Sequence, residues 1–386
     1  MNILDRIDAH RKGDIDSIPL GHSRLAQHIF IHQNMYHLIG GMGGTGKSSF
    51  VDQMYAIKPH YTVKNTVELH NITFHCTIRS LERSKELRKA KWITLLLYMK
   101  YGILIDSVTM LGFGKLKSVV TDELLVKIKE MYAEIESWED NIEIIDGTDN
   151  PTGLFKYARD YAEKVGTYYT YKDNKPIKRR NGVVKTISVD EIPVDKNGNK
   201  LCKPFEPYYQ PDDPYQINTY IIDNFHAMNK ESGLSDKQNL DKMSQYARIL
   251  RDVYKYHVVG VAQLNRGTED TMRKVKTSGL PQKSDFAGSD QPYSDCDAAA
   301  IMFDPYKVEM NWVMNMDVKA CVSTQGINRL RTLHLLKNTY GADNKIFAYQ
   351  FVGEVGMFNQ IDKMGSKMDT KDYKQIANPK FNESYV

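Results

Sequence analysis

Residues 41–48 are the part of this chain best suited to chemistry on a phosphate group. They read Gly-Met-Gly-Gly-Thr-Gly-Lys-Ser and match the pattern G-x-x-x-x-G-K-[ST] at every position. Glycines allow backbone N–H groups to turn inward and touch phosphate oxygens, where a Cβ would collide. In such a loop the lysine reaches the β- and γ-phosphates, and the serine hydroxyl ligates Mg²⁺. We therefore predict that ATP and Mg²⁺ bind to Gly41, Gly43, Gly44, Thr45, Gly46, Lys47, Ser48 and Ser49.

The segments on either side of this phosphate loop fit the same function. Residues 36–39 form an apolar run that predicts a strand entering the loop. Residues 48–55 predict the helix that leaves it, ending near Lys58 and Pro59. The N-terminus of such a helix adds unpaired N–H donors and a partial positive charge for an anion. The alternative is a glycine-rich turn that binds nothing, and the presence of both flanking elements argues against it.

A phosphate loop also needs an acid on a second strand to support the metal ion. Asp223 closes the apolar run 219–223, which predicts a carboxylate at the sheet edge where ligands of open α/β sheets bind. We predict that Asp223 and Ser48 together hold Mg²⁺. Asp146 ends a similar run at 142–146 and is the alternative acid. The non-functional alternative is that Asp223 only ends the strand and begins a turn.

Glu82 and Gln263 follow two further predicted strands, at 72–78 and 257–262. A carboxylate at position 82 could orient the water that attacks the γ-phosphate. A glutamate early in a helix also simply complements the helix dipole. An amide at position 263 could sense the γ-phosphate and pass its presence to the following loop. An ordinary loop amide explains Gln263 equally well.

Residues 266–289 are basic, contain several glycines and have no clear periodicity, so we expect a flexible loop after Gln263. Such loops can follow a phosphate backbone when several of them line a channel. A solvated charged loop is the simpler alternative. The basic run 178–180 and five tyrosines between 168 and 209 could also contact nucleic acid, although packing explains them as well. The predicted DNA-binding residues are Arg266, Arg273, Lys274, Lys276, Lys283, Ala287 and Gly288.

The composition of the chain limits the class of protein it can belong to and the cell compartment in which it is expected. Its 386 residues are 41% hydrophobic and 26% charged, as in ordinary globular proteins, and a net charge of +4 does not by itself indicate nucleic acid. The four cysteines lack zinc-site spacing and predict reduced thiols. The start has no signal-peptide pattern, and the longest apolar run, 93–99, is too short to cross a bilayer. We expect a cytoplasmic protein with no membrane partner.

Alternating strands and helices predict an α/β fold with a mostly parallel sheet covered by helices on both faces. Turn signals at Asn181-Gly182 and Asn197-Gly198 mark residues 166–214 as a β-hairpin insertion. We expect a docking or linker helix within 1–17, an ATPase domain over 18–360, and a tail over 361–386 whose last twenty residues are mobile. Further helices are expected at 81–101, 118–136, 151–164 and 238–254, and further strands at 297–302, 331–337 and 346–352.

In their order along the chain, these motifs resemble the RecA-like ATPase domain of DnaB-type replicative helicases, in a divergent form like those of bacteriophages. The resemblance covers about residues 18–355. It implies a hexameric helicase that hydrolyses ATP at subunit interfaces and acts on single-stranded DNA in replication, in the host cytoplasm if phage-encoded. Glu82 would be the catalytic base and Gln263 the γ-phosphate sensor. Besides the phosphate loop, the matching segments are Ile18-Pro19-Leu20-Gly21, Ser80-Leu81-Glu82-Arg83-Ser84-Lys85-Glu86, Ile221-Ile222-Asp223, Gln263-Leu264-Asn265-Arg266, Ser284-Asp285-Phe286 and Asp295-Cys296-Asp297-Ala298.

Two departures from the family pattern bear on mechanism and partners. Only about 17 residues stand where the family has a large N-terminal domain, so a primase or loader remains only a candidate partner. Late in the ATPase domain the family has a catalytic lysine, followed two residues later by an arginine finger that acts on the neighbouring subunit's nucleotide. Lys337 matches this lysine, but Thr339 occupies the place of the arginine. Such a finger can be worth roughly 10³–10⁵ in rate. Lys337, Arg329 or Arg331 would have to compensate, or hydrolysis is slow.

Three other functions share the phosphate loop. A RecA-like recombination ATPase would form open filaments instead of rings. A small-molecule P-loop kinase would need an arginine-rich lid, and no such motif is present in the sequence. A nucleotide-binding assembly factor that hydrolyses ATP weakly would be consistent with Thr339.

Overall fold

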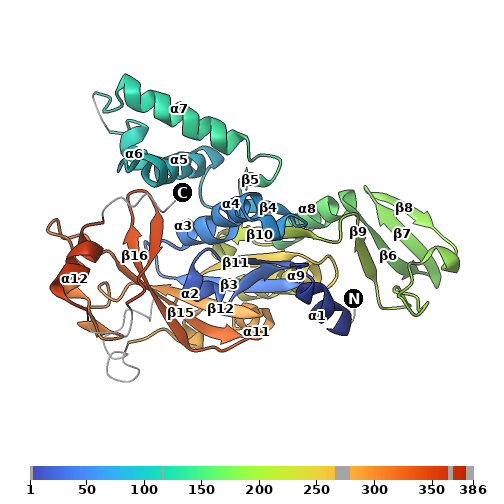
Figure 1. The fold of residues 1–386 in the computed structure, drawn as a ribbon. Coiled ribbons are helices and arrows are strands. Elements are labelled where there is room, and N and C mark those ends of the chain that lie inside the picture. The colour runs from blue at the N-terminus through green and yellow to red at the C-terminus, as the bar shows by residue number, and fades with distance from the viewer. Residues whose placement is uncertain (1–2, 115–116, 266–278, 364–367, 380–386) are drawn as a thin grey trace.

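Nine strands form the central sheet in the computed structural model, which describes residues 3–114, 117–265, 279–363 and 368–379 (Figure 1). The six strands from β12 to β5 are parallel, and the strands from β15 to β17 are antiparallel. The prediction of a mostly parallel sheet is confirmed. The spatial order is β17 (Met357–Gln360), β16 (Lys345–Val352), β15 (Leu330–Asn338), β12 (Ala298–Phe303), β3 (Met35–Gly41), β11 (His257–Gln263), β10 (Gln216–Asp223), β4 (Thr73–Ser80) and β5 (Ile142–Asp146).

Helices cover both faces of this sheet because its strands alternate apolar side chains between two cores. On β10, for example, Ile221 packs in the core on one face and Tyr220 in the core on the other. On the first face lie α3 (Lys47–Val51), the π-helical segment Asp52–Ile57, α4 (Lys58–Asn65) and α5 (Lys85–Tyr101). On the second lie α8 (Pro151–Lys164), α9 (Asp236–Asp252) and α11 (Gln291–Asp295).

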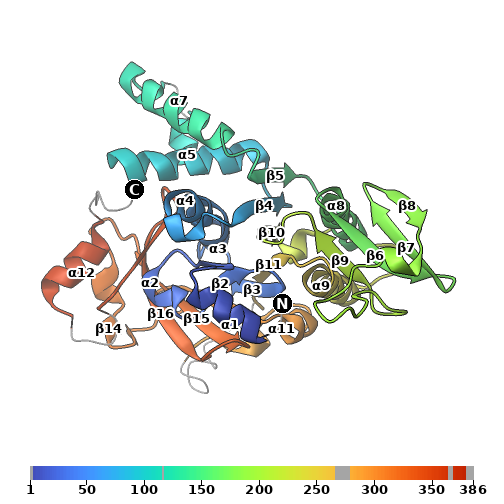
Figure 2. The ribbon, with the colours of Figure 1, turned by 45° about the vertical axis from the view of Figure 1, so that its right-hand side comes forward.

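Two further helices lie beside α5. Helices α6 (Ser107–Met110) and α7 (Asp122–Glu136) pack against α5, on its side away from the sheet in Figures 1 and 2. Helix α5 begins at Lys85 and α7 at Asp122, both later than predicted, because Ser84 and Thr121 cap their first turns. Glu82 therefore lies in a loop before α5 and not in the helix itself.

The helix that follows the phosphate loop is longer than predicted. It continues through the π-helical segment into α4 and ends at Asn65 instead of near Pro59. Pro59 is the second residue of α4, directly after the π-helical segment.

The predicted insertion is a four-stranded antiparallel sheet. Its turn at Asn181 and Gly182, with φ angles of 51° and 72°, joins β7 to β8 as the sequence indicated. Tyr168 stacks on Tyr254 of the main domain at 5.4 Å between ring centroids, and Tyr209 is buried. The structure thus favours packing over base stacking for these two tyrosines. The strands, in spatial order, are β8 (Val183–Thr186), β7 (Lys175–Arg180), β6 (Gly166–Lys172) and β9 (Tyr208–Pro211).

The ends of the described chain are helical. Helix α1 (Ile3–Arg11) exposes Leu4 and Ile7, and it precedes a small two-stranded sheet that contains Ile18. Helix α12 (Thr370–Ala377) buries Ile376, so the prediction of a mobile end is wrong for these eight residues. The remaining named elements near the ends are β1 (Ser17–Pro19), α2 (Ser23–Ala26), β2 (Phe30–His32), β13 (Trp312–Val313) and β14 (Met316–Asp317).

All four cysteines are buried and unpaired. Among the described residues, none of the helices combines the length and the apolar character that crossing a bilayer requires.

Two buried histidines in contact with each other are expected to make the folded state less stable in acid. His37 on β3 and His257 on β11 contact each other at 4.4 Å between ring centroids, and burial lowers the pKa of His37 to about 3 and that of His257 well below its usual value. Both stay neutral when folded but protonate when unfolded, so their contribution is complete above pH 6.5 and is lost as the pH falls toward the folded pKa. Between pH 7 and pH 5 we expect the free energy of unfolding to fall by roughly 2 kcal/mol per histidine.

Urea denaturation at pH 7 and pH 5 measures this loss. His37→Gln should reduce the pH dependence by one histidine's share, whereas His10→Gln at an exposed site of α1 should leave it unchanged. Equal pH dependence in His37→Gln and the wild type would contradict this prediction.

Candidate functional site

The phosphate loop joins the carboxyl end of β3, in the middle of the sheet, to the N-terminus of α3. Gly44 and Gly46 have φ angles of 73° and 93°, which only glycine adopts without strain. A Cβ on Gly41 would lie 2.8 Å from the carbonyl oxygen of Met302. The loop therefore requires glycine both for its backbone path and for its close packing.

A cavity of about 520 Å³ opens at this loop and gathers residues from several elements. The Lys47 ammonium donates hydrogen bonds to the carbonyls of Gly41 at 2.7 Å and Met42 at 3.0 Å. Burial lowers the pKa of Lys47, while Asp223 and Glu82 act in the opposite direction. The cavity is lined by Gly43, Gly44, Gly46, Lys47, Ser48, Ser49, Glu82, Arg83, Lys91, Asp223, Asn224, Gln263, Phe351 and Gly353.

The structure brings one of the two candidate acids to the phosphate loop. The Ser48 hydroxyl donates to the Asp223 carboxylate at 3.2 Å. A hydroxyl and a carboxylate oxygen are hard donors of the kind Mg²⁺ takes, with the rest of its shell left to water and phosphate. Asp146 instead accepts a hydrogen bond from the backbone N–H of Lys85 at 2.8 Å and does not line the cavity. No cluster of three or more His, Cys, Asp or Glu side chains suited to a metal occurs within the described ranges.

Glu82 is held at the same cavity by residues at the end of β10. The Asn224 amide donates to the Glu82 carboxylate at 2.5 Å, and the backbone N–H of Leu81 donates to the carbonyl of Asp223 at 2.8 Å. Glu82 is exposed in the loop two residues before Ser84, the N-cap of α5, and so does not lie in the first turn of that helix. The geometry suits a carboxylate that binds a water molecule beside the phosphates.

Gln263 lies at the end of β11 and contacts the described C-terminal part of the basic stretch 266–289. The backbone N–H of Ala287 donates to the Gln263 carbonyl at 3.0 Å. His226 joins the same two residues, since its Nε2 donates to the Ala287 carbonyl at 3.1 Å and its Nδ1 accepts from the Gln263 N–H at 3.3 Å. A change at the cavity that moves Gln263 would therefore act directly on the backbone at Ala287.

The predicted DNA-binding residues are only partly placed. Arg266, Arg273, Lys274 and Lys276 lie outside the described residues. Lys283 and Gly288 are exposed and Ala287 is half-buried, all within the segment that contacts the end of β11. The basic run 178–180 is tied into ion pairs, for example Arg179 with Glu163 at 2.5 Å.

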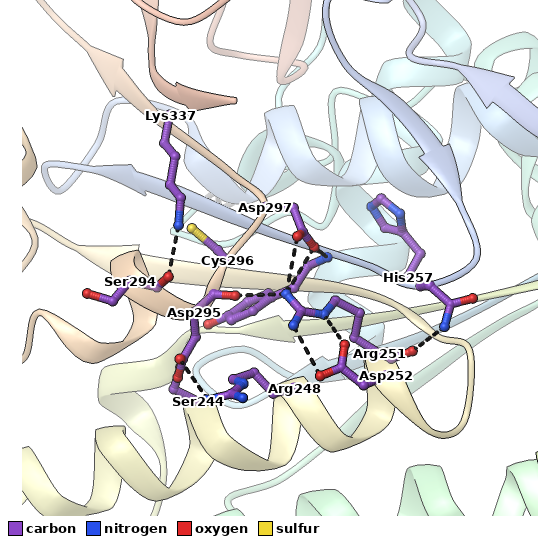
Figure 3. A network of polar contacts seen from close by, with 12 residues as sticks. Ser244, Arg248, Arg251, Asp252, His257, Ser294, Asp295, Cys296, Asp297 and Lys337 are labelled. Carbon is purple, nitrogen blue, oxygen red and sulfur yellow. Dashed lines mark hydrogen bonds and ion pairs between the residues drawn. The ribbon is translucent and has the colours of Figure 1, made fainter. Parts of the chain in front are cut away.

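Lys337 lies outside the cavity of its own chain. Its ammonium donates to the carbonyls of Tyr293 at 3.0 Å and Ser294 at 2.8 Å, at the C-terminal end of α11 (Figure 3). Thr339, in the predicted arginine position, is exposed. In the same network Arg251 pairs with Asp297 at 3.2 Å and ties the start of β12 to α9 (Figure 3).

The two arginines proposed to compensate for Thr339 are not available. Arg329 is buried and forms two hydrogen bonds with Glu354, at 2.5 and 2.6 Å. Arg331 is buried and pairs with Asp304 at 3.2 Å. Reaching a second subunit would break the ion pair of Arg331 with the buried Asp304 and that of Arg329 with Glu354, so neither residue suits the role in this conformation.

One cluster beside Asp223 was not predicted from the sequence. Arg88 of α5 is buried, with its guanidinium 3.1 Å from Asp223 and 3.0 Å from Asp52 of the π-helical segment. Trp92 donates its indole N–H to Asp52 at 2.9 Å. Burial acts to lower the pKa of Arg88, but Asp52 and Asp223 outweigh it and hold that pKa above its usual value. The available signal was a charged residue, Asp52, inside the apolar run after the phosphate loop.

The topology and the site together define a P-loop protein with a RecA-like α/β fold. No protein-family model and no curated protein sequence matches the chain. Among solved structures it is similar to the "ATPase Domain of G40P", with 15% identity, a TM-score of 0.59, and coverage of 93% of this chain and 97% of that one.

A second similar structure is described as "The Structure Of A DnaB-Like Replicative Helicase And Its Interactions With Primase". Identity is 16% and the TM-score is 0.58, and the match covers 92% of this chain and 67% of that one. At these identities the similarity establishes the fold. The predicted resemblance to DnaB-type ATPase domains is confirmed at that level.

Proposed function

We propose that this protein is an ATP-driven helicase or translocase that acts on single-stranded DNA in replication. The observation that carries the proposal is the convergence of Lys47, Ser48, Glu82, Asp223 and Gln263, from four separate strand ends, on one cavity. These residue types supply the functions that phosphoryl transfer needs, namely phosphate binding, metal support and positioning of the attacking water.

Each residue has a distinct task in this proposal. Lys47 and the loop N–H groups bind the β- and γ-phosphates, Ser48 and Asp223 hold Mg²⁺, and Glu82 accepts a proton from the attacking water. Loss of the γ-phosphate releases Gln263. Through its contacts with His226 and Ala287, this release shifts the segment that carries the proposed DNA contacts.

Ring formation is part of the same proposal. The two similar structures carry the words ATPase domain and replicative helicase in their descriptions, which supports a helicase role for this fold. Helix α1 exposes two apolar side chains, Leu4 and Ile7, at 76% and 59%, and in this proposal they dock on a neighbouring copy. We propose a hexamer with Lys337 near the neighbour's nucleotide, and a primase or loader as further partners.

One observation favours a second candidate, a nucleotide-binding assembly factor with weak hydrolysis. Thr339 offers no guanidinium, and Lys337 is bonded to backbone carbonyls of its own chain. Tight ATP binding without measurable turnover would support this alternative.

Mass measurement together with strand displacement tests the proposed function. Mg²⁺ and ATP should convert the protein to closed rings that unwind a forked DNA duplex. Open helical filaments would indicate the recombination ATPase instead. A monomer at high concentration that displaces no strand would contradict the proposal.

A further inference from the structure

Arg83 is the one guanidinium among the described residues that line the ATP cavity. Its side chain is exposed and has no hydrogen bond or ion pair within the described ranges. The arginines on either side of it in the sequence, Arg79 on β4 and Arg88 on α5, are each paired with a carboxylate. Arg79 pairs with Asp149, and Arg88 pairs with Asp52. Arg83 is therefore a cation at the cavity that no carboxylate of the described residues neutralises.

The backbone of Arg83 is held in place, although its side chain has no partner among the described residues. The Ser80 hydroxyl donates to the Arg83 carbonyl at 2.8 Å and accepts from the Arg88 guanidinium at 3.1 Å. Arg88 is in turn anchored by Asp52, next to the phosphate loop helix. The loop that carries Glu82 and Arg83 is thus tied to the elements that position the phosphates.

Positive charge is crowded around this cavity. Burial lowers the pKa of both Lys47 and Lys91, and the positive charge of Arg83 acts on both in the same direction. Lys307 adds a fourth cation, which donates to the Gly43 carbonyl at 2.7 Å. Repulsion among these groups is relieved by a ligand with several negative charges, such as the triphosphate of ATP.

We propose that Arg83 binds the γ-phosphate oxygens of ATP in its own chain and stabilises their charge during hydrolysis. This inference rests on the proposed function. Water attacks the γ-phosphorus, the bond from that phosphorus to the β–γ bridging oxygen breaks, and ADP leaves, while the proton lost by the water passes to Glu82. Arg83 takes no proton. Its planar fork matches the phosphate oxygens, whose charge distribution changes in the transition state.

This assignment explains how the site can work with threonine at position 339. An arginine finger can act within its own chain as well as from a partner. Arg329 and Arg331 are buried in ion pairs, whereas Arg83 is exposed beside Glu82. The cavity therefore holds its own guanidinium.

Steady-state ATP hydrolysis by Arg83→Ala tests the role. We expect kcat to fall by on the order of 10²–10³-fold, with ATP affinity changing much less. Arg83→Lys should recover only part of the rate, since an ammonium lacks the fork. Arg159→Ala, at a partly exposed ion-paired arginine on α8, is the control and should keep the wild-type rate. Thermal unfolding of each variant checks that the fold is intact.

Mixing Arg83→Ala with Lys47→Ala protomers tests whether Arg83 acts in its own chain. No recovery of activity is expected, because each protomer then lacks one part of its own site. Recovery would show action on a neighbour, and it would overturn the inference, as would a folded Arg83→Ala protein with kcat within threefold of wild type. A wild-type protein without ATPase activity would overturn the proposed function as well, which separates the two failures.

Discussion

Lys47→Ala is expected to reduce ATP hydrolysis by at least about 10²–10³-fold, the cost of removing one charge-stabilising donor from a transition state. The Lys47 ammonium lies at the phosphate loop, where it donates hydrogen bonds to the carbonyls of Gly41 and Met42. A bound phosphate would replace these carbonyls as its partner. Alanine removes the charge and its two hydrogen bonds but keeps every glycine of the loop, so the loss should appear in ATP binding and in turnover.

Phosphate release and the binding of a fluorescent ATP analogue measure the two effects separately. Lys64→Ala, at an exposed lysine of α4, is the matched control and should behave as wild type. Glu82→Gln should differ from Lys47→Ala, because it keeps ATP binding and loses hydrolysis. ATPase activity of Lys47→Ala within threefold of wild type would contradict the assignment of the loop.

Arg88→Met is expected to destabilise the folded protein by about 3–5 kcal/mol, because it leaves buried carboxylates without their cation. Asp52 is 6% exposed and Asp223 is 6% exposed, and Arg88 pairs with both. The double variant Asp52→Leu with Arg88→Met removes one of the unpaired charges along with the cation. It should therefore be more stable than Arg88→Met alone.

Urea denaturation of the wild type and both variants gives these free energies. The Mg²⁺ concentration needed for half-maximal ATP binding should also change in Arg88→Met, since Asp223 loses the partner that fixes its carboxylate. A single variant as stable as the wild type would rule out the role of Arg88 in holding the two acids.

Local patterns predicted most of the fold. Strands such as β10 and β11 contain short apolar runs and are buried along nearly their whole length, as expected of parallel strands covered on both faces. The start of α5 was less predictable, because it depends on whether Ser84 or an earlier residue accepts the capping hydrogen bond. The insertion needed its turn residues Asn181 and Gly182 to be recognised, and these were sufficient to place one hairpin.

The residues of the site likewise divide into those that local sequence patterns predict and those that only the folded structure brings together. The phosphate loop is contiguous in sequence, and Asp223 follows from the end of an apolar run, so both were predicted. The contact of Arg88 with Asp52 and Asp223 joins three distant segments, and no periodicity reveals it. For the tyrosines of the insertion, the sequence left two roles open. Their composition suits both base stacking and packing, and only the contact of Tyr168 with Tyr254 decides between them for that residue.

The most direct measurement of the central claim is the initial rate of ATP hydrolysis by the wild-type protein with and without single-stranded DNA. The account predicts turnover that requires Mg²⁺, rises when DNA is added, and loses this stimulation as salt weakens DNA binding. A rate that is the same with and without DNA at low salt, or no turnover in either case, would contradict it.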